Sequence, residues 1–381
     1  MAFDPALVHA FDQLFEGESF AGKEVLVLLP DRTRPFPFEL ILQLFSIRLW
    51  TADADENRIM YAIASGTHVP GPADLDPLRA FLAEPPIVLD ALPEERMVSV
   101  GTTKRGTDVR VHPALLESDI VISLDMLALH YFAGFGGGGK MLFPGLGART
   151  SIAANHRLAL APGRGLAPGV EPGRTHDNPV ALDLREAHEL LPRARHLTLA
   201  PVDEDEEERF GLFVWSDYAE FDRLCANYAN RCRVGERHTA DFVVALATDA
   251  VGIDVVQAHK ALFHAALYAR DGGEVILFAE CPEGVGSPAL ARWLAQPNRE
   301  RLEAEARSNY DLNAQTAISL AGIAARTRVT WVSPRPLPEL AAWGITVVAD
   351  PAEALGRVER GLREGRKVIR LDNPTRRLPE A

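Results

Sequence analysis

Two histidines of this sequence stand beside turns that follow predicted strands. His68 ends the turn that begins at Ser65, and His130 opens a glycine-rich stretch that runs to Lys140. The pKa of imidazole lies close to neutral, so histidine can take up and release a proton at working pH. Two such groups can serve the two faces of one substrate. We therefore predict that His68 and His130 form an acid/base pair.

Four consecutive glycines, Gly136, Gly137, Gly138 and Gly139, stand directly before Lys140. Backbone without Cβ atoms can approach a ligand closely and can present its N–H groups to an anion. The aromatic residues around this stretch indicate an anchored loop and not a linker. We predict that the four glycines bind a phosphate-bearing cofactor beside Lys140.

The same stretch permits an alternative interpretation. From Gly134 to Lys140 it fits G-x-x-x-x-G-K, the phosphate loop of nucleotide hydrolases, in which serine or threonine should follow and hold magnesium. Here Met141 follows. Asp125, at the end of an apolar run, stands where such enzymes carry their magnesium-binding aspartate. A phosphate-loop nucleotide-binding hydrolase is therefore the alternative function.

Further candidate residues are placed on predicted helices. Thr150 or Ser151 can cap a helix that carries His156, and an imidazole on a rigid helix suits a borderline metal such as nickel. Gln257 and Lys260 are three residues apart on a helix beginning near residue 254, so they share a face. A lysine and an amide on one face can bind a carboxylate.

These residues belong to elements that alternate along the chain. Short β-branched runs at 25–29, 98–100, 120–122 and 243–246 alternate with helical patterns such as 37–50 and 254–269. This alternation is typical of an α/β protein with mostly parallel sheets. Ligands of such sheets bind at the carboxyl ends of strands, where several of the candidate residues stand.

A polar stretch before residue 241 predicts a domain boundary near residue 236. We expect residues 1–236 to form an N-terminal α/β domain that carries the cofactor loop and the histidines. Residues 237–365 should form a second α/β domain that contributes Gln257 and Lys260. The final segment, 366–381, either completes the second sheet or returns to the first domain. The active site is expected in the cleft between the two domains.

The composition restricts the class of protein. The chain has 381 residues and a formal net charge of −13, which argues against nucleic acid as a partner. It shows no secretory signal pattern and no apolar run long enough to cross a membrane, so we expect a cytoplasmic protein without a membrane partner. Cys225, Cys232 and Cys281 are interpreted as small buried residues.

Together, these motifs resemble those of the nickel-dependent lactate racemase family, the nickel-pincer 2-hydroxy-acid racemases and epimerases. The similarity runs from about Asp31 to Lys260. The family's D-x-T-R-P motif corresponds here to Asp31–Pro35, and its G-T-H-R-P motif corresponds to Gly66–Pro70. Its glycine-loop motif corresponds to His130–Lys140. The metal-binding histidine of the family falls at His156, and its Q-x-x-K pair falls at Gln257 and Lys260.

The resemblance implies a role for each residue. His68 and His130 would be the catalytic acid/base histidines. Lys140 would tether the cofactor, which Asp31 helps to bind, and His156 would bind nickel. Arg34, Gln257 and Lys260 would bind the substrate. The implied cofactor is a pyridinium mononucleotide with two sulfur donors and one carbon donor to nickel, made by separate biosynthetic enzymes.

The implied reaction is inversion at C2 of a small 2-hydroxy acid. The carbinol hydrogen leaves as a hydride while a histidine takes the hydroxyl proton, because this hydrogen is too weakly acidic to leave as a proton. Two departures put the substrate in doubt. Val69 replaces an arginine, and Gly136 to Gly139 replace the usual S-G-G-R. A roomier, less charged loop suits a longer hydroxy acid, such as a sugar acid, as well as lactate.

Overall fold

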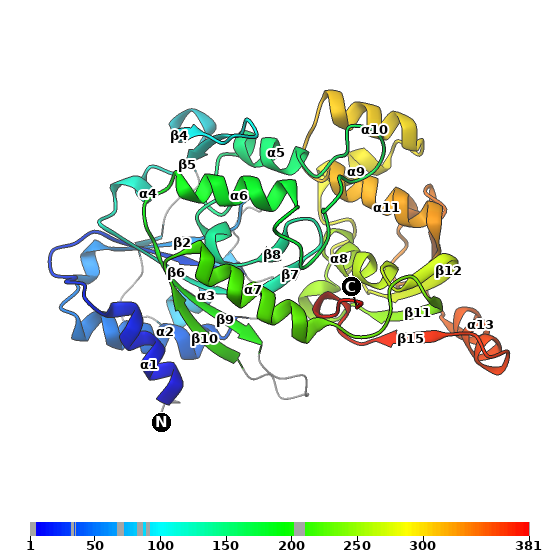
Figure 1. Ribbon diagram of the computed structural model, residues 1–381, viewed down its shortest axis with the longest axis horizontal. Helices are drawn as coiled ribbons and strands as arrows, with labels where there is room; N and C mark the ends of the chain where they lie inside the picture. The colour runs from blue at the N-terminus through cyan, green and yellow to red at the C-terminus, as the bar shows by residue number, and fades with distance from the viewer. Residues whose placement is uncertain are drawn as a thin grey trace. The chain divides into compact units, whose positions relative to one another are not determined.

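The protein is described by a computed structural model that covers residues 5–31, 34, 36–66, 72–81, 87–88, 92–201 and 210–380 (Figure 1). The chain divides into two compact units. The first comprises residues 1–128, 136–155 and 181–228, and the second comprises 129–135, 156–180 and 229–381. Both have an α/β architecture with mostly parallel sheets, as predicted.

The first unit is built on a six-stranded sheet of order β10-β9-β6-β1-β2-β3. Its neighbours pair in parallel except for the edge strand β10, which is antiparallel to β9. Its strands are β1 (Val25–Leu29), β2 (Ile59–Ile63), β3 (Ile87–Val88), β6 (Ile120–Met126), β9 (Arg195–Pro201) and β10 (Phe210–Trp215). Its main helices are α1 (Pro5–Phe15), α2 (Phe38–Thr51), α3 (Pro72–Phe81), most of α6 (Pro179–Glu189) and most of α7 (Tyr218–Cys232).

The central strands of this sheet are continuous apolar runs. Every residue of β1 and β6 is buried, which is expected for parallel strands covered by helices on both faces. Apolar side chains of α1 and α2, among them Phe11 and Phe45, complete this core. The chain leaves β1 toward β2 and β3 on one side and later places β6 on the other side. The strand order therefore reverses between β1 and β6, the point where open α/β sheets bind ligands.

Smaller elements attach to this unit. The run at 98–100 is not part of the main sheet, since β4 (Val98–Thr102) pairs antiparallel with β5 (Asp108–Val111). Figure 1 shows this hairpin beside α5 (Arg149–Arg157). Ser151 lies inside the first turn of α5, where its hydroxyl donates to the carbonyl oxygen of Asp108 and accepts from the backbone N–H of Arg110. Ser151 therefore ties α5 to β5.

The second unit contains a fully parallel sheet of order β14-β13-β12-β11-β15. Its strands are β11 (Ala240–Leu246), β12 (Ala269–Phe278), β13 (Arg328–Val332), β14 (Thr346–Val348) and β15 (Val368–Leu371). Its helices are α8 (Val255–Ala266), α9 (Pro288–Leu294), α10 (Arg299–Ser308), α11 (Ala314–Arg326), α12 (Pro338–Ala341) and α13 (Ala352–Arg363). The segment after residue 366 pairs with β11, so it completes this second sheet.

The division into units differs from a single boundary at residue 236. The chain passes to the second unit at 229, and two earlier segments, 129–135 and 156–180, also belong to that unit. Packing explains this assignment. Tyr131 lies against His259 and Phe263 of α8, and Leu160 and Leu166 pack on the core of the second unit. His130 and His156 therefore group with Gln257 and Lys260, and not with Gly136 to Lys140.

Candidate active site

Three neighbouring strands of the first unit end in predicted site residues. β1 leads to Asp31 and Arg34, β2 leads to Gly66, and Asp125 stands near the end of β6. The three strands are parallel neighbours, so their carboxyl ends share one edge of the sheet. The Arg34 N–H donates to the Asp31 carbonyl oxygen at 3.1 Å, which places both residues in one turn.

Gly66, two residues before His68, is the last described residue after β2. Its N–H donates to the Gly145 carbonyl oxygen at 3.0 Å, so Gly66 is attached to the segment that follows Lys140. His68 itself lies outside the described residues. Its role as one of the two proton-transfer groups stays a prediction.

The glycine loop follows β7 (Ala128–His130) and contains β8 (Gly134–Gly136) and a 3-10 turn, η3 (Gly138–Met141). Gly137 has a φ of 84°, and a Cβ there would lie 2.5 Å from the Met126 carbonyl oxygen. A Cβ on Gly138 would lie 2.6 Å from the ring of Phe221. The loop therefore needs glycine at both positions, because it closes directly onto the side chains and backbone beneath it.

The two ends of the glycine run differ in the space beside them. A Cβ on Gly139 would lie 2.7 Å from the ring of His188 and 2.9 Å from the Tyr218 hydroxyl. A Cβ on Gly136 would meet nothing closer than 3.8 Å, and its neighbours include the Arg34 guanidinium at 3.9 Å. A side chain at Gly139 would therefore collide with its neighbours, whereas a Cβ at Gly136 would make ordinary contacts, among them one to Arg34.

Asp125 lies beneath this loop with its carboxylate buried. One carboxylate oxygen accepts the Gly138 N–H at 2.9 Å, and burial raises the pKa of Asp125 to about 6. The loop then enters a 3-10 turn of four residues and no α-helix begins at Lys140. The phosphate loop of a nucleotide hydrolase leads into a helix. The short 3-10 turn, with no α-helix beginning at Lys140, therefore disfavours the alternative function.

In the second unit, the Phe132 ring contacts two predicted site residues. Its centroid lies 4.6 Å from that of His130 and 4.8 Å from that of His156, edge-on in both cases. The Ala133 N–H donates to Nδ1 of His130 at 3.2 Å, so a neutral His130 ring carries its hydrogen on Nε2. The backbone of Ala133 therefore fixes the orientation and the tautomer of the His130 ring.

The next residue, Tyr131, connects His130 with helix α8. Its ring stacks on His130 with centroids 5.7 Å apart, and it meets His259 edge-on at 4.8 Å. Its hydroxyl lies 2.7 Å from Oγ1 of Thr316 on α11, and Nε2 of His259 lies 2.8 Å from Oγ of Ser319 on the same helix. Tyr131, on which His130 stacks, is thus fixed by buried contacts to two helices.

Gln257 and Lys260 lie near the start of α8, just past the carboxyl end of β11. Asp254 caps this helix by accepting the Gln257 N–H at 2.7 Å. Nζ of Lys260 donates to Oε1 of Gln257 at 2.5 Å, which confirms that the two side chains share a face of α8. This pair presents one cation and one amide from a rigid helix.

Several residues of this site carry no motif that the sequence analysis recognised. These are Asp125 in its role under the loop, the aromatic contacts Tyr131 and Phe132, and the residues beneath Gly139, His188 and Tyr218. One signal was available. Ser123 and Asp125 are polar residues two positions apart in an otherwise apolar strand, so they share one face.

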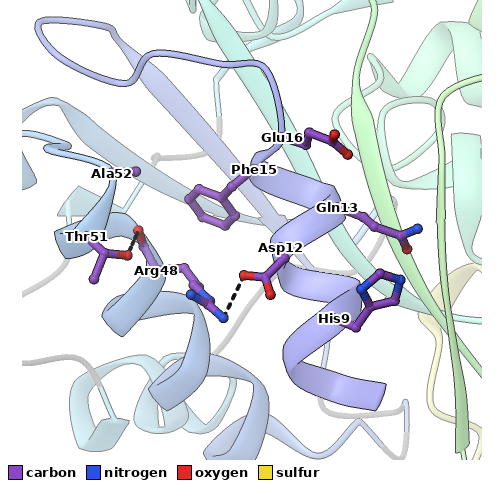
Figure 2. A pocket seen from close by; sticks show the side chains of 8 residues that line it. All are labelled: His9, Asp12, Gln13, Phe15, Glu16, Arg48, Thr51 and Ala52. Carbon is purple, nitrogen blue, oxygen red and sulfur yellow. Dashed lines mark hydrogen bonds and ion pairs between the residues drawn. The ribbon is translucent and has the colours of Figure 1, made fainter. Parts of the chain in front are cut away.

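Other features of the described residues do not offer a competing site. Within them, no group of three or more His, Cys, Asp or Glu side chains could hold a metal ion, and no helix is long and apolar enough to cross a membrane. The three cysteines are buried and form no disulfide, as predicted. A hollow of about 420 Å³ between α1 and α2 is lined by a closed Arg48–Asp12 ion pair (Figure 2). It contains none of the predicted site residues.

Comparisons with known proteins agree with the motifs. Residues 4–166 match the family model of the lactate racemase N-terminal domain. The lactate racemase of Thermoanaerobacterium thermosaccharolyticum is 23% identical over 280 residues, and that of Lactiplantibacillus plantarum is 25% identical over 283 residues. Each alignment covers 72% of this chain and 64% of the relative, so the chain spans slightly less than two thirds of the relatives' length.

Two solved structures share the fold. The lactate racemase apoprotein from T. thermosaccharolyticum superposes with a TM-score of 0.82 at 21% identity, over 98% of this chain and 93% of that chain. A protein from Thermotoga maritima gives a TM-score of 0.77 at 18% identity, over 98% and 97%. The resemblance predicted from the motifs is confirmed: this chain is similar to lactate racemases, and its residues 4–166 match the model of their N-terminal domain.

Proposed function

We propose that this protein is an isomerase, a racemase or epimerase that inverts C2 of a 2-hydroxy acid with a nickel-pincer nucleotide cofactor. The observation that best supports it is the glycine loop at the β1/β6 edge of the first sheet, with Arg34 beside Gly136 and Lys140 directly after Gly139. The similarity to lactate racemases supports the reaction class.

The residues present fit such a cofactor. The loop backbone is bare of side chains from Gly136 to Gly139, and the side of the loop facing Asp125 and Phe221 is already closed. The cofactor phosphate would bind this loop with the help of Asp31, and Lys140 would supply the tethering amine. His156 would supply one nitrogen ligand to nickel. The remaining donors would come from the cofactor, since the described residues form no complete metal site.

The chemistry that the cofactor would supply is reversible acceptance of a hydride. His68 or His130 takes up the hydroxyl proton as the hydride leaves C2, which oxidises the substrate to a planar 2-keto acid. His68 and His130 would each return a proton to the oxygen for one configuration of the acid, so the substrate would undergo no net redox change. His130 must first move its own hydrogen to Nδ1, with loss of the Ala133 bond, before Nε2 can accept a proton.

The substrate's carboxylate and hydroxyl groups would be bound by Arg34, Gln257 and Lys260. Gly136 lies beside the Arg34 guanidinium, so an additional polar group of a longer acid that binds at this end of the loop would meet this cation. We therefore propose lactate or a longer acid, such as a sugar acid, as substrate. The cytoplasmic location and the dependence on separate cofactor-producing enzymes belong to the same proposal.

The test is to co-express the chain with enzymes that make the pincer cofactor. The purified protein is analysed for nickel and for added mass at Lys140, then incubated with one enantiomer each of lactate, malate and phenyllactate, and with gluconate. Chiral analysis is the readout, because direct return of the hydride inverts C2 without solvent exchange. We expect stoichiometric nickel and inversion of at least one acid.

Variants assign the roles. His68→Ala and His130→Ala should retain nickel and lose inversion, whereas Lys140→Ala should lose the added mass and His156→Ala should lose nickel. A folded protein with neither nickel nor added mass would contradict the proposal. Magnesium-dependent binding of ATP by such a protein would favour the nucleotide hydrolase instead.

A further inference from the structure

Asp125 is an acidic residue whose burial the fold alone does not explain. Its carboxylate accepts from the Gly138 N–H at 2.9 Å and the Thr198 hydroxyl at 3.0 Å on one oxygen, and from the Ser123 hydroxyl at 2.7 Å on the other. All three partners are uncharged. Burying an ionised carboxylate with neutral partners is costly, and burial raises the pKa of Asp125 to about 6. At neutral pH the chain nevertheless carries this charge.

The Asp125 carboxylate supports the glycine loop. A Cβ on Gly137 would lie 2.8 Å from the Asp125 carboxylate, so the loop rests directly on it. Gly138 begins the 3-10 turn that contains Lys140, and the Lys140 N–H donates to the Gly137 carbonyl oxygen at 3.3 Å. The Asp125 carboxylate is therefore hydrogen-bonded to the loop at Gly138, two residues before Lys140. A hydrogen bond to an ionised acceptor is stronger than one to a neutral acceptor.

The orientation of the carboxylate is itself imposed by neighbouring elements. Nε1 of Trp215 on β10 donates to Oγ1 of Thr198 at 2.9 Å, so the Thr198 hydroxyl hydrogen points to Asp125. Cys225 on α7 lies close enough to interact with this charge. Burial and the Asp125 carboxylate both raise the pKa of the Cys225 thiol. The chain of bonds crosses the adjacent strands β6, β9 and β10. Such a support costs stability and fixes one geometry.

We propose that Asp125 is a positioning residue of the cofactor loop, which holds the Gly138 N–H and thereby fixes the backbone from which Lys140 extends. The inference rests on the proposed function only in naming Lys140 as the tether. It assigns to this aspartate a structural task that acts through the loop, and it makes Thr198 and Trp215, beyond the part matched by the racemase domain, parts of the same support.

The experiment compares the full-length apoprotein with three variants and one control. Asp125→Asn keeps a neutral acceptor of the same shape, Asp125→Ala removes it, and Thr198→Val removes one donor. Glu274→Gln neutralises a buried carboxylate of the second unit that is bonded to Thr330 and Arg357. Hydrogen–deuterium exchange of loop peptides spanning 134–142 and the thermal unfolding midpoint are measured at pH 7.

Asp125→Asn should accelerate exchange of the loop roughly tenfold, and Asp125→Ala should accelerate it further, as expected when a bond to a charged acceptor is weakened or lost. Thr198→Val should have a smaller effect. The unfolding midpoint of Asp125→Asn should equal or exceed that of the wild type, because a costly buried charge is gone. Glu274→Gln should show the reverse pattern, with a lower midpoint and unchanged loop exchange.

A second readout uses protein from the co-expression strain. Mass spectrometry of the peptide with Lys140 should show at least threefold less tethered cofactor in Asp125→Asn than in the wild type. Unchanged loop exchange in folded Asp125→Asn and Asp125→Ala would overturn the inference. A lower unfolding midpoint of Asp125→Asn together with faster loop exchange would overturn it too. If no chain carries cofactor while the exchange results hold, the proposed function fails and the positioning role stands.

Discussion

The two units hold their candidate residues by different means. In the first unit, the loop before Lys140 is fixed through its backbone, by a buried carboxylate and by glycines that have no space for a Cβ. In the second unit, His130 and His156 are held through side chains, by the rings of Tyr131 and Phe132 and by a capped helix.

This difference bears on how each unit tolerates substitution. A backbone contact at 2.5 Å from a missing Cβ leaves no way to adjust, so one added methyl group displaces the loop. Aromatic packing can relax around a smaller side chain and loses energy in proportion to the contacts removed. We therefore expect all-or-none effects in the glycine loop and graded effects around His130.

The largest effect is expected for Gly137→Ala. Its φ of 84° is strained for alanine, and the added methyl group would collide with the Met126 carbonyl oxygen. The free energy of unfolding should fall by about 3 kcal/mol or more, and no cofactor should be tethered. Gly136→Ala is the matched control, since its Cβ would have ordinary contacts, and it should cost about 1 kcal/mol or less. Urea unfolding measures both; equal losses would remove the contrast.

Phe132→Leu tests the graded behaviour of the second unit. Loss of its ring contacts to His130, Tyr131 and His156 should lower the free energy of unfolding by about 1–2 kcal/mol. Since Phe132 orients His156, nickel affinity of the loaded protein should drop by about tenfold. Phe263→Leu is the control, because Phe263 contacts Tyr131 and His259. It should lose similar stability with unchanged nickel affinity, and a matching loss of nickel would refute the role of Phe132.

Acid should reveal the residues beneath the loop. Burial lowers the pKa of His188 to about 4, below its ordinary value of 6.5. The folded state therefore binds this proton less readily than the unfolded state, so stability is present above pH 6.5 and is lost as pH falls toward 4. His188→Phe keeps the ring and removes the titration. At pH 5 the free energy of unfolding of His188→Phe should exceed that of the wild type by up to about 2 kcal/mol.

The comparison for His188→Phe is made at two pH values. At pH 8 the histidine is neutral in both states, so the gain from lost titration should disappear. A gain of the same size at pH 5 and pH 8 would show that packing, and not titration, is responsible.

The smallest effect is expected at the start of α8. Asp254→Ala removes the cap that accepts the Gln257 N–H and should cost about 1 kcal/mol. Because Gln257 and Lys260 stand in the first turns of this helix, KM for the acid should rise several-fold with little change in kcat. Asn298→Ala removes the equivalent cap of α10 and should cost similar stability without changing KM. A change in kcat alone would argue against binding by this helix.

Much of the fold follows from local pattern. The runs at 25–29 and 120–122 become central strands, and helices begin within one residue of 37 and 254, because apolar periodicity and a capping aspartate are local signals. The hairpin of β4 and the membership of 129–135 and 156–180 were not predictable. They depend on partners far away in the chain, which no local periodicity encodes.

The candidate site shows the same limit. Gly136 to Gly139, Lys140 and the Gln257–Lys260 pair were recognisable because motif spacing is local. The support beneath the loop could not be recognised from the sequence. Asp125 is hydrogen-bonded to Thr198, 73 positions later, and Gly139 lies beside His188 only in the folded protein. Asp125 was interpreted as a candidate magnesium ligand. Its burial under the loop and its neutral partners give it a different part in the structure.

The interrupted course of the chain orders events during synthesis. Every residue of the first unit has been made by residue 228, whereas the segments with His130 and His156 belong to a unit whose largest part, 229–381, follows. Tyr131 finds His259 and Thr316 only after α8 and α11 emerge. His130 and His156 therefore reach their packing partners later in synthesis than the loop before Lys140 does, and under the proposed function the cofactor would be loaded after release from the ribosome.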